Sequence, residues 1–329
     1  MNEATYDVTA IGNAIVDVLA RTDDRFLADY RLAKGTMSLV DSGAAELLYG
    51  MMGPGVEISG GSAANTVAGI AGLGGRAAFI GKVADDQLGQ VFAHDIRAAG
   101  VAFDTPPLSQ GPTTARCLIF VTPDAQRTMQ TFLGASAEVG PEDVDEALIV
   151  ASQVLYLEGY LWDQPRAKEA FLKASRIAAG AGRTVSLTLS DPFCVDRHRA
   201  SFLELVERHV DVLFANEEEI KSLYQVDDFD SALQRVRAHC EIAVLTRSEK
   251  GSVVVRGDEV HVVDAENVTG VVDTTGAGDA YAAGFLYAYT HGRDLRACAR
   301  LGGVLAGEVI SHYGARPEAD LKKLAALVL

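Results

Sequence analysis

The chain has 329 residues, of which 48% are hydrophobic and 22% are charged, and its formal net charge is −16. This length suits one large α/β domain or two smaller ones. A surface this acidic repels nucleic-acid phosphates and anionic lipids, so we expect neither nucleic acid nor a membrane as a partner.

The N-terminal segment MNEATYDVTAIG has no basic stretch followed by an apolar run, so it does not predict a signal peptide, and we expect a cytoplasmic protein. The four cysteines are widely scattered and form no CxxC pair. They therefore predict buried, reduced thiols rather than a zinc site or a disulfide framework: Cys117, Cys194, Cys240 and Cys298.

Short apolar runs alternate with helix-like segments, a pattern typical of a mostly parallel sheet covered by helices. Strands are predicted at 6–11, 76–83, 154–157, 184–189, 210–214 and 242–246, and a hairpin at 251–256 and 259–263 around Gly257-Asp258. Helices are predicted at 63–74, 85–99 and 280–290, where apolar residues fall on one face or a glycine follows the last turn.

Two regions interrupt this alternation. Residues 14–48 and 103–133 are rich in alternating, β-branched pieces with no helix expected between them. We predict that they form a small second β-sheet, called the lid below, which projects from the main body. No Pro-, Gly- or Ser-rich linker separates it, so residues 1–329 are expected to form a single domain.

Several common motifs are excluded. Between Gly75 and Gly81-Lys82 there is one residue too many for a Walker A loop, and Val83 follows where Ser or Thr is needed. The segment 72–77 fits GxGxxA, but it ends a helix and enters a strand, the reverse of a dinucleotide-binding site. No HExxH or equivalent histidine pair is present, which argues against a zinc hydrolase.

The segment 272–280, Val-Asp-Thr-Thr-Gly-Ala-Gly-Asp-Ala, runs from a small-residue loop directly into a helix. Loop amides at a helix N-terminus, together with the helix dipole, form an anion site. A carboxylate such as Asp279 repels phosphate, so its place beside an anion site indicates another task. Accepting a proton from an attacking hydroxyl is such a task. The alternative, that Asp279 caps the helix and the glycines only form a turn, fits this loop equally well.

The segment Asp273–Asp279 resembles the DTxGAGD signature of the ribokinase-like (PfkB) carbohydrate and nucleoside kinases. Similar family motifs occur in order at Gly60–Asn65, Gly81–Val83, Asp85–Gly89 and Asn216–Glu219, so the resemblance covers nearly the whole chain. It implies a three-layer α/β/α fold with a mostly parallel central sheet and a small β-sheet lid. The segment 12–17 is most similar to the adenosine kinase branch, and Ser62 stands where ribokinases usually carry Lys.

The resemblance implies that Asp279 is the catalytic base and that the amides of Gly276, Ala277 and Gly278 hold the transferring phosphoryl group. A carboxylate at a helix N-terminus is expected to be a weak base. The loose transition state of phosphoryl transfer tolerates that weakness.

The resemblance further assigns residues to substrate and phosphate binding, each with a simpler alternative. Asn13 and Asp17 would bind vicinal hydroxyls of the substrate. In the simpler alternative, Asn13 only ends a strand and Asp17 is exposed in a turn. Gly61, Ser62 and Asn65 would contact the same sugar, or form a helix start capped by Ser62. The remaining candidates are Arg127, for phosphates or as a solvent-facing strand residue, and Tyr160 and Phe193, for a base pocket or the core.

The resemblance also implies residues that bind ATP and its cations, at three places in the chain. Asn216 and Glu219 would act on Mg²⁺ or its waters, although the same residues suit an ordinary solvated first helical turn. The nucleotide loop would include Thr246, Ser248 and Gly251. Asp273 matches a position near a monovalent-cation site in many relatives.

The leading hypothesis is ATP- and Mg²⁺-dependent phosphorylation of adenosine, with K⁺ as an additional cofactor. The alternatives are a fructose, ribose or keto-deoxy sugar acid acceptor, another nucleoside, or a non-catalytic ligand-binding protein. We expect a small-molecule substrate, a lid that closes over it, and either a monomer or a homodimer formed through the lid.

Overall fold

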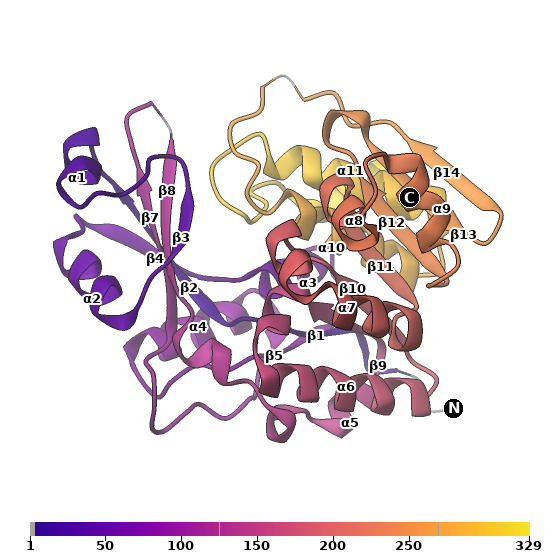
Figure 1. Ribbon diagram of the computed structural model, residues 1–329, viewed down its shortest axis with the longest axis horizontal. Helices are drawn as coiled ribbons and strands as arrows, with labels where there is room; N and C mark the ends of the chain where they lie inside the picture. The colour runs from indigo at the N-terminus through magenta and orange to yellow at the C-terminus, as the bar shows by residue number, and fades with distance from the viewer. Residues whose placement is uncertain (1–3, 125, 269) are drawn as a thin grey trace.

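The computed structural model describes residues 4–124, 126–268 and 270–329. It consists of a nine-stranded sheet with helices on both faces and a five-stranded sheet that projects to one side (Figure 1). The three-layer α/β architecture with a smaller second sheet is the predicted fold.

The large sheet has the strand order β14-β13-β12-β11-β10-β9-β1-β5-β6. In this order, the neighbouring strands from β12 to β6 all pair in parallel, and β13 and β14 extend the sheet as the predicted antiparallel hairpin. The strands are β1 Tyr6–Ile11, β5 Ala77–Ile80, β6 Val101–Ala102, β9 Ser152–Glu158, β10 Thr184–Thr188, β11 Val212–Asn216, β12 Ile242–Thr246, β13 Ser252–Arg256 and β14 Glu259–Val263.

Two hydrophobic cores lie on opposite faces of this sheet, because successive side chains of a strand point in opposite directions. In β12, Ile242 and Val244 join one core, whereas Ala243 and Leu245 join the other. The first core is covered by α3 Ser62–Gly72, α4 Gln87–Ala98, α10 Ala277–Thr290, α11 Leu295–Val309 and α12 Leu321–Val328. The second is covered by α5 Glu146–Val150, α6 Pro165–Gly180, α7 Pro192–His209, α8 Glu217–Tyr224 and α9 Phe229–Val236.

The lid sheet has the order β3-β8-β7-β2-β4 and is larger than its expected boundaries. Strand β4 lies beyond residue 48, and two helices interrupt the first lid region where none was expected. Each of these helices begins after an aspartate whose side chain accepts a hydrogen bond from the first turn, Asp23 and Asp41. The elements are β2 Ile15–Arg21, α1 Asp24–Asp29, β3 Met37–Leu39, α2 Ser42–Met51, β4 Gly55–Gly60, β7 Ala115–Val121 and β8 Arg127–Phe132.

Short 3₁₀ helices complete the chain at η1 Gly134–Glu138, η2 Pro141–Asp143, η3 Gly159–Asp163 and η4 Ser248–Lys250. All four cysteines are free; three are buried and Cys240 is partly buried. Within the described ranges, the helices are all too short or too polar to cross a bilayer.

The strand order indicates where along the carboxyl ends of the large sheet a ligand site is expected. After β1 the chain builds β5 and β6 on one side, and from β9 onward it builds on the other side of β1. The direction of winding therefore changes between β1 and β9. In open α/β sheets, ligands bind at the carboxyl ends of the strands beside such a point.

Candidate active site

Asp279 lies in the first turn of α10 and contacts two side chains from the start of α3. Ser62 Oγ donates to Asp279 Oδ1 at 2.6 Å, and Asn65 Nδ2 donates to Oδ2 at 3.1 Å. The helices α3 and α10 pack against each other, which brings together residues separated by more than 200 positions in the sequence. Each carboxylate oxygen retains acceptor capacity for a further donor.

Burial raises the pKa of Asp279 to about 6, and the hydrogen bonds from Ser62 and Asn65 only partly oppose this effect. This direction differs from the weak base expected for a carboxylate at a helix N-terminus, because desolvation is the largest influence on the pKa of this group. A carboxylate with this pKa is ionised at neutral pH and is a better proton acceptor than an ordinary aspartate.

The two glycines of the loop have different surroundings. Gly276 is the N-cap of α10 with φ 78°, and a Cβ there would lie 2.6 Å from the carbonyl oxygen of Ala315. At Gly278 a Cβ would meet no described atom within 4 Å. One of the three expected anion-binding amides, that of Ala277, donates to Thr274 O at 3.2 Å. The open space at Gly278 is therefore the part of the loop that suits an anion.

Gly61 precedes α3 as its N-cap, so Ser62 is not the capping residue and its hydroxyl is directed to Asp279 instead. Gly61 has φ 99°, and a Cβ there would overlap the carbonyl oxygen of Asn13. Glycine is required at this position by both the backbone conformation and the close approach.

These surroundings predict opposite results for two glycine-to-alanine substitutions. We expect Gly61→Ala to lower the free energy of unfolding by about 2 kcal/mol or more, because strain and overlap add. We expect Gly278→Ala to leave stability unchanged or raise it slightly, since alanine is favoured over glycine in a helix. Urea unfolding followed by circular dichroism measures both, and equal destabilisation by the two would contradict the prediction.

Asn13 and Glu158 meet at the point between β1 and β9 where the winding changes. Glu158 Oε1 accepts from the Asn13 side chain at 2.6 Å and from its backbone amide at 3.2 Å, and Oε2 accepts from the Ala63 amide at 2.8 Å. Asn13 Oδ1 accepts from Ser136 at 2.8 Å. Burial raises the pKa of Glu158 to about 7. Most of the hydrogen-bonding capacity of Asn13 is therefore used within the protein, which leaves one amide hydrogen for a substrate.

Asp17 lies on β2 of the lid, and a Cβ at Gly60 would be 2.5 Å from its carboxylate. Burial raises the pKa of Asp17 to about 6. Repulsion from Asp279 adds to this shift, whereas Arg316 and Arg127 oppose it. These four charges therefore share one site, which the lid and the main body form together.

Arg127, on β8, forms an ion pair with Asp273 in the loop before α10, and both side chains are buried. Asp273 also accepts hydrogen bonds from Thr275 and from the Gly314 amide. The Nε and Nη2 atoms of Arg127 are buried and lack a hydrogen-bond partner within the described ranges. Arg127 is therefore not a solvent-facing strand residue.

Arg316 belongs to the same site but had no recognisable signal in the sequence. Its guanidinium donates to Asn65 Oδ1 at 3.3 Å and to Ser59 Oγ at 2.7 Å, and it lies 3.5 Å from Asp95. It thus orients the same asparagine that binds Asp279.

Asn216 and Glu219 form a capping box at the start of α8. Asn216 Oδ1 accepts from the Glu219 amide, and both Glu219 oxygens accept from Asn216, at 2.7 and 2.9 Å. Burial raises the pKa of Glu219 to about 7. Over the part of the chain that is described, no three His, Cys, Asp or Glu side chains are grouped to hold a metal ion. A direct, all-protein Mg²⁺ site does not fit these residues, and a contact through metal-bound water stays a prediction.

The predicted nucleotide loop joins β12 to β13 at the same edge of the sheet. Thr246 ends β12, where it is paired in register with Asn216 of β11. Ser248 has φ 50° and Gly251 has φ 78°, with a Cβ at Gly251 excluded by the neighbouring backbone. The sharp turn brings the loop to the carboxyl ends of the strands, as a nucleotide site there requires.

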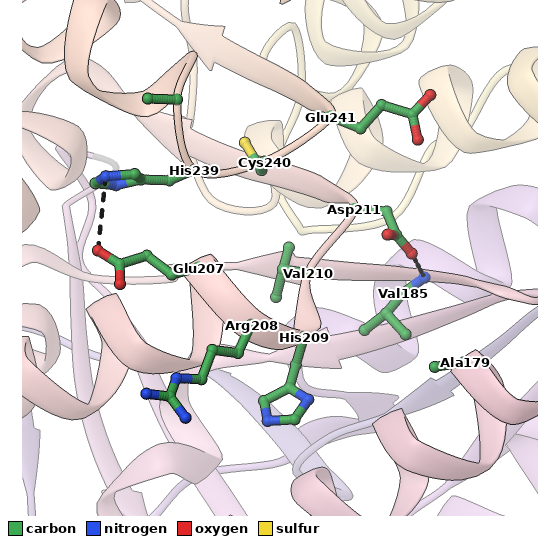
Figure 2. Close-up of a pocket in the computed structure, with 11 residues that line it drawn as sticks. Ala179, Val185, Glu207, Arg208, His209, Val210, Asp211, His239, Cys240 and Glu241 are labelled. Atoms are coloured by element: carbon green, nitrogen blue, oxygen red, sulfur yellow. Dashed lines mark hydrogen bonds and ion pairs between the residues drawn. The ribbon is translucent and has the colours of Figure 1, made fainter.

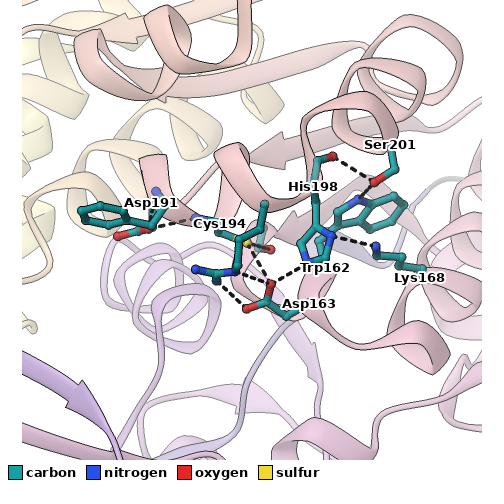
Figure 3. Close-up of polar contacts among 10 residues, drawn as sticks. Trp162, Asp163, Lys168, Asp191, Cys194, His198 and Ser201 are labelled. Carbon is teal, nitrogen blue, oxygen red and sulfur yellow. Dashed lines mark hydrogen bonds and ion pairs between the residues drawn. The ribbon is translucent and has the colours of Figure 1, made fainter.

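Tyr160 and Phe193 follow β9 and β10 and are partly exposed: 39% of Tyr160 and 71% of Phe193 are accessible. Neither is a core residue in this conformation. Their two segments are joined by Asp163, which accepts from Arg197 at 2.7 Å and contacts His198 at 2.7 Å. Figure 3 shows the Asp163 carboxylate directed toward the His198 ring. Trp162, next to Asp163, is buried and donates to Ser201 at 2.9 Å.

A separate hollow lies at the amino ends of the strands, opposite the candidate site (Figure 2). Most of its residues directly precede β11 and β12, and two pairs of its groups contact each other: His239 with Glu207 at 3.6 Å, and Asp211 with the Val185 amide at 2.7 Å. It contains none of the candidate site residues, so we do not assign the chemistry to it.

Comparison with known proteins identifies related chains. The profile of the pfkB family carbohydrate kinases matches residues 54–321. The crystal structure of an adenosine kinase from Sinorhizobium meliloti is 56% identical with a TM-score of 0.91, and the match covers 99% of this chain and all of that one. The structure of a probable sugar kinase from Rhizobium etli CFN 42 is 53% identical with a TM-score of 0.91, covering 98% of both chains. The adenosine kinase of Saccharomyces cerevisiae is 26% identical over 94% of this chain and 96% of its own.

Proposed function

Because the chain belongs to the pfkB family of carbohydrate kinases, it is a phosphotransferase that acts on a sugar or a nucleoside, and we propose that its acceptor is adenosine. The observation that carries the proposed chemistry is the position of Asp279, held by Ser62 and Asn65 beside the open space at Gly278. The proposed acceptor is supported by the 56% identity to the Sinorhizobium meliloti adenosine kinase.

In the proposed reaction, Asp279 accepts the proton of the adenosine 5′-hydroxyl as that oxygen attacks the terminal phosphoryl group of ATP. Ser62 and Asn65 hold the carboxylate in one orientation, which lowers the entropic part of the barrier. The N-terminal amides of α10 and the buried guanidinium of Arg127 face the growing negative charge with fixed dipoles and a fixed charge. The products are AMP and ADP.

The lid and the turn after β1 supply the contacts to the sugar of the acceptor. Asp17 accepts from a ribose hydroxyl, and the remaining amide hydrogen of Asn13 donates to another. Tyr160 and Phe193 lie where the carboxyl ends of β9 and β10 meet, and we assign them to the adenine ring, which would cover their exposed apolar surface.

The role proposed for Mg²⁺ follows from the groups that could bind it. Mg²⁺ binds phosphate oxygens and keeps several waters, so it would enter with ATP and neutralise its phosphates. Asn216 and Glu219 would contact it only through those waters. The proposed location is the cytoplasm, where ATP and adenosine are both present, and the proposed role is purine salvage.

The second candidate acceptor is a sugar, and the 53% identity to the Rhizobium etli probable sugar kinase favours it. The two candidates differ in what must fill the space beside Tyr160 and Phe193. A nucleoside needs a wide apolar slot there, whereas a sugar needs polar groups.

The test is a coupled ADP-release assay with ATP and Mg²⁺ against adenosine, other nucleosides, fructose, ribose and a keto-deoxy sugar acid. We expect kcat/KM for adenosine to exceed that for each sugar by about 100-fold or more, because a sugar leaves the aromatic slot empty. A Phe193→Ala variant should lose this preference while a sugar's kcat/KM changes little. A wild-type preference for any of the sugars would replace the proposed acceptor.

A further inference from the structure

We propose that Arg127 takes the place of a monovalent cation beside Asp273, so that this enzyme needs no K⁺. The negative charge of the loop before α10 is then neutralised by an arginine of the lid. The proposal concerns the same site as the proposed function. Of the two measurements described below, the turnover assay rests on that function and the thermal unfolding does not. The resemblance to the family predicts a cation near Asp273, whereas the structure has an arginine there.

Asp273 has no free capacity for a metal ion. Its Oδ1 accepts from the Thr275 hydroxyl at 2.7 Å and from the Thr275 amide at 3.1 Å. Its Oδ2 accepts from the Gly314 amide at 3.1 Å and from Arg127 Nη1. Two hydrogen bonds to each oxygen fill the positions through which a carboxylate binds a cation. The guanidinium also cancels the negative charge that would attract one.

The ion pair is buried, with 7% of the Arg127 side chain and 8% of the Asp273 side chain accessible. Separating two buried, paired charges leaves each without compensation, which is strongly unfavourable. Arg127 begins β8 in the lid, and Asp273 lies three residues before the Gly276 N-cap of α10. One contact therefore joins the lid to the loop that carries the anion site, and the loop is neutralised only while the lid is in place.

The rest of the guanidinium is available for another ligand. Arg127 Nε and Nη2 are buried and have no hydrogen-bond partner in the described part of the chain, which is unfavourable for each of these donors. A phosphoryl oxygen would satisfy them, because guanidinium suits two-point contact with phosphate. Arg127 thus holds Asp273 through Nη1 and keeps two donors for the anion, which a bound K⁺ cannot do.

The first measurement is turnover with K⁺ replaced by tetramethylammonium at constant ionic strength. We expect the wild-type rate to change by less than about twofold, which is the range of a nonspecific salt effect. Activation of the wild type by K⁺ of about tenfold or more would overturn the proposal, since a change of that size requires a specific site.

The second measurement is thermal unfolding with K⁺ or tetramethylammonium, which does not depend on any activity. In Arg127→Met the Asp273 carboxylate is released, and we expect K⁺ to raise the Tm by about 2 °C relative to tetramethylammonium. The wild type and the double variant Arg127→Met/Asp273→Asn should show no such difference, because neither offers an uncompensated carboxylate. An equal K⁺ effect on the wild type and on Arg127→Met would refute the proposal, even if no acceptor were turned over.

Discussion

Replacing Asp279 with asparagine is expected to lower kcat/KM by about three orders of magnitude, which is within the range for removal of a general base. Asparagine has the same shape and still accepts from Ser62, but it cannot take the proton of the acceptor. The fold should tolerate the change, because burial already raises the pKa of Asp279 and so disfavours its charge. The coupled assay measures activity, and circular dichroism checks the fold.

A matched control is available in the next helix. Asp294 caps α11 and accepts from the Ala297 amide at 2.8 Å, so it is also a helix-start aspartate but has no part in the site. Asp294→Asn should keep wild-type kcat/KM. If both variants lost activity equally, a general effect on stability would explain the result and Asp279 would not be the base.

The same assignment gives a pH profile. The proton acceptor must be ionised, so kcat/KM should fall at least tenfold per pH unit below about pH 6, the pKa of both Asp279 and Asp17. Both pKa values lie above the ordinary value of 3.8, so these two carboxyls bind more protons in the folded chain than in the unfolded chain between pH 6 and pH 4. These two carboxyls therefore stabilise the fold as the pH falls. Activity should be lost while circular dichroism is still native, and a loss that coincides with unfolding would contradict this assignment.

Replacing Lys82 with methionine is expected to lower the free energy of unfolding by about 3–5 kcal/mol, the usual effect of breaking a buried ion pair. Lys82 follows β5 and pairs with Asp143 of η2, and 9% and 3% of the two side chains are accessible. Methionine fills the volume of the lysine stem but leaves the Asp143 charge buried and unpaired. Urea unfolding followed by circular dichroism measures the loss.

Two control variants separate burial from charge. Lys82→Met/Asp143→Asn removes both charges and keeps the acceptor for the Gly140 amide, so it should recover most of the lost stability. Arg25→Met breaks the exposed Arg25–Asp29 pair and should cost less than about 0.5 kcal/mol. A loss below about 1 kcal/mol in Lys82→Met would show that Asp143 finds another partner or takes up a proton.

The main body was more predictable from the sequence than the lid, for identifiable reasons. Strand β12 was predicted at its observed bounds because Ile242–Thr246 is a compact apolar run with polar residues on both sides. Strand β4 was not predicted, because Gly55–Gly60 begins and ends with glycine and has only a short alternation. It becomes a strand by pairing with β2, a contact that no local pattern records.

The candidate site divides in the same way. The loop before Asp279 was found because small residues leading into a helix are a local signal. Glu158 gave a weaker signal, as the charged end of the apolar strand β9. Arg316 gave none, and Lys82 was noted only within the Gly81–Val83 motif, without its partner Asp143, because charges that meet across long stretches of chain leave no periodicity in the sequence. The pKa of Asp279 also depends on burial, which appears only when α3 and α10 are packed together.

Trp162 is the only tryptophan of the chain, and its surroundings make it an optical reporter of one region. The indole is 3% accessible, packs against Phe171 and Phe202, and has the Lys168 ammonium 5.5 Å from its centre. Its fluorescence emission should therefore lie toward the blue in the folded chain. Because Trp162 belongs to η3, two residues after Tyr160, its spectrum responds to a ligand placed on that turn. Its ring contacts come from α6 and α7 rather than from the lid, so a fluorophore attached to the lid would be needed to follow lid movement.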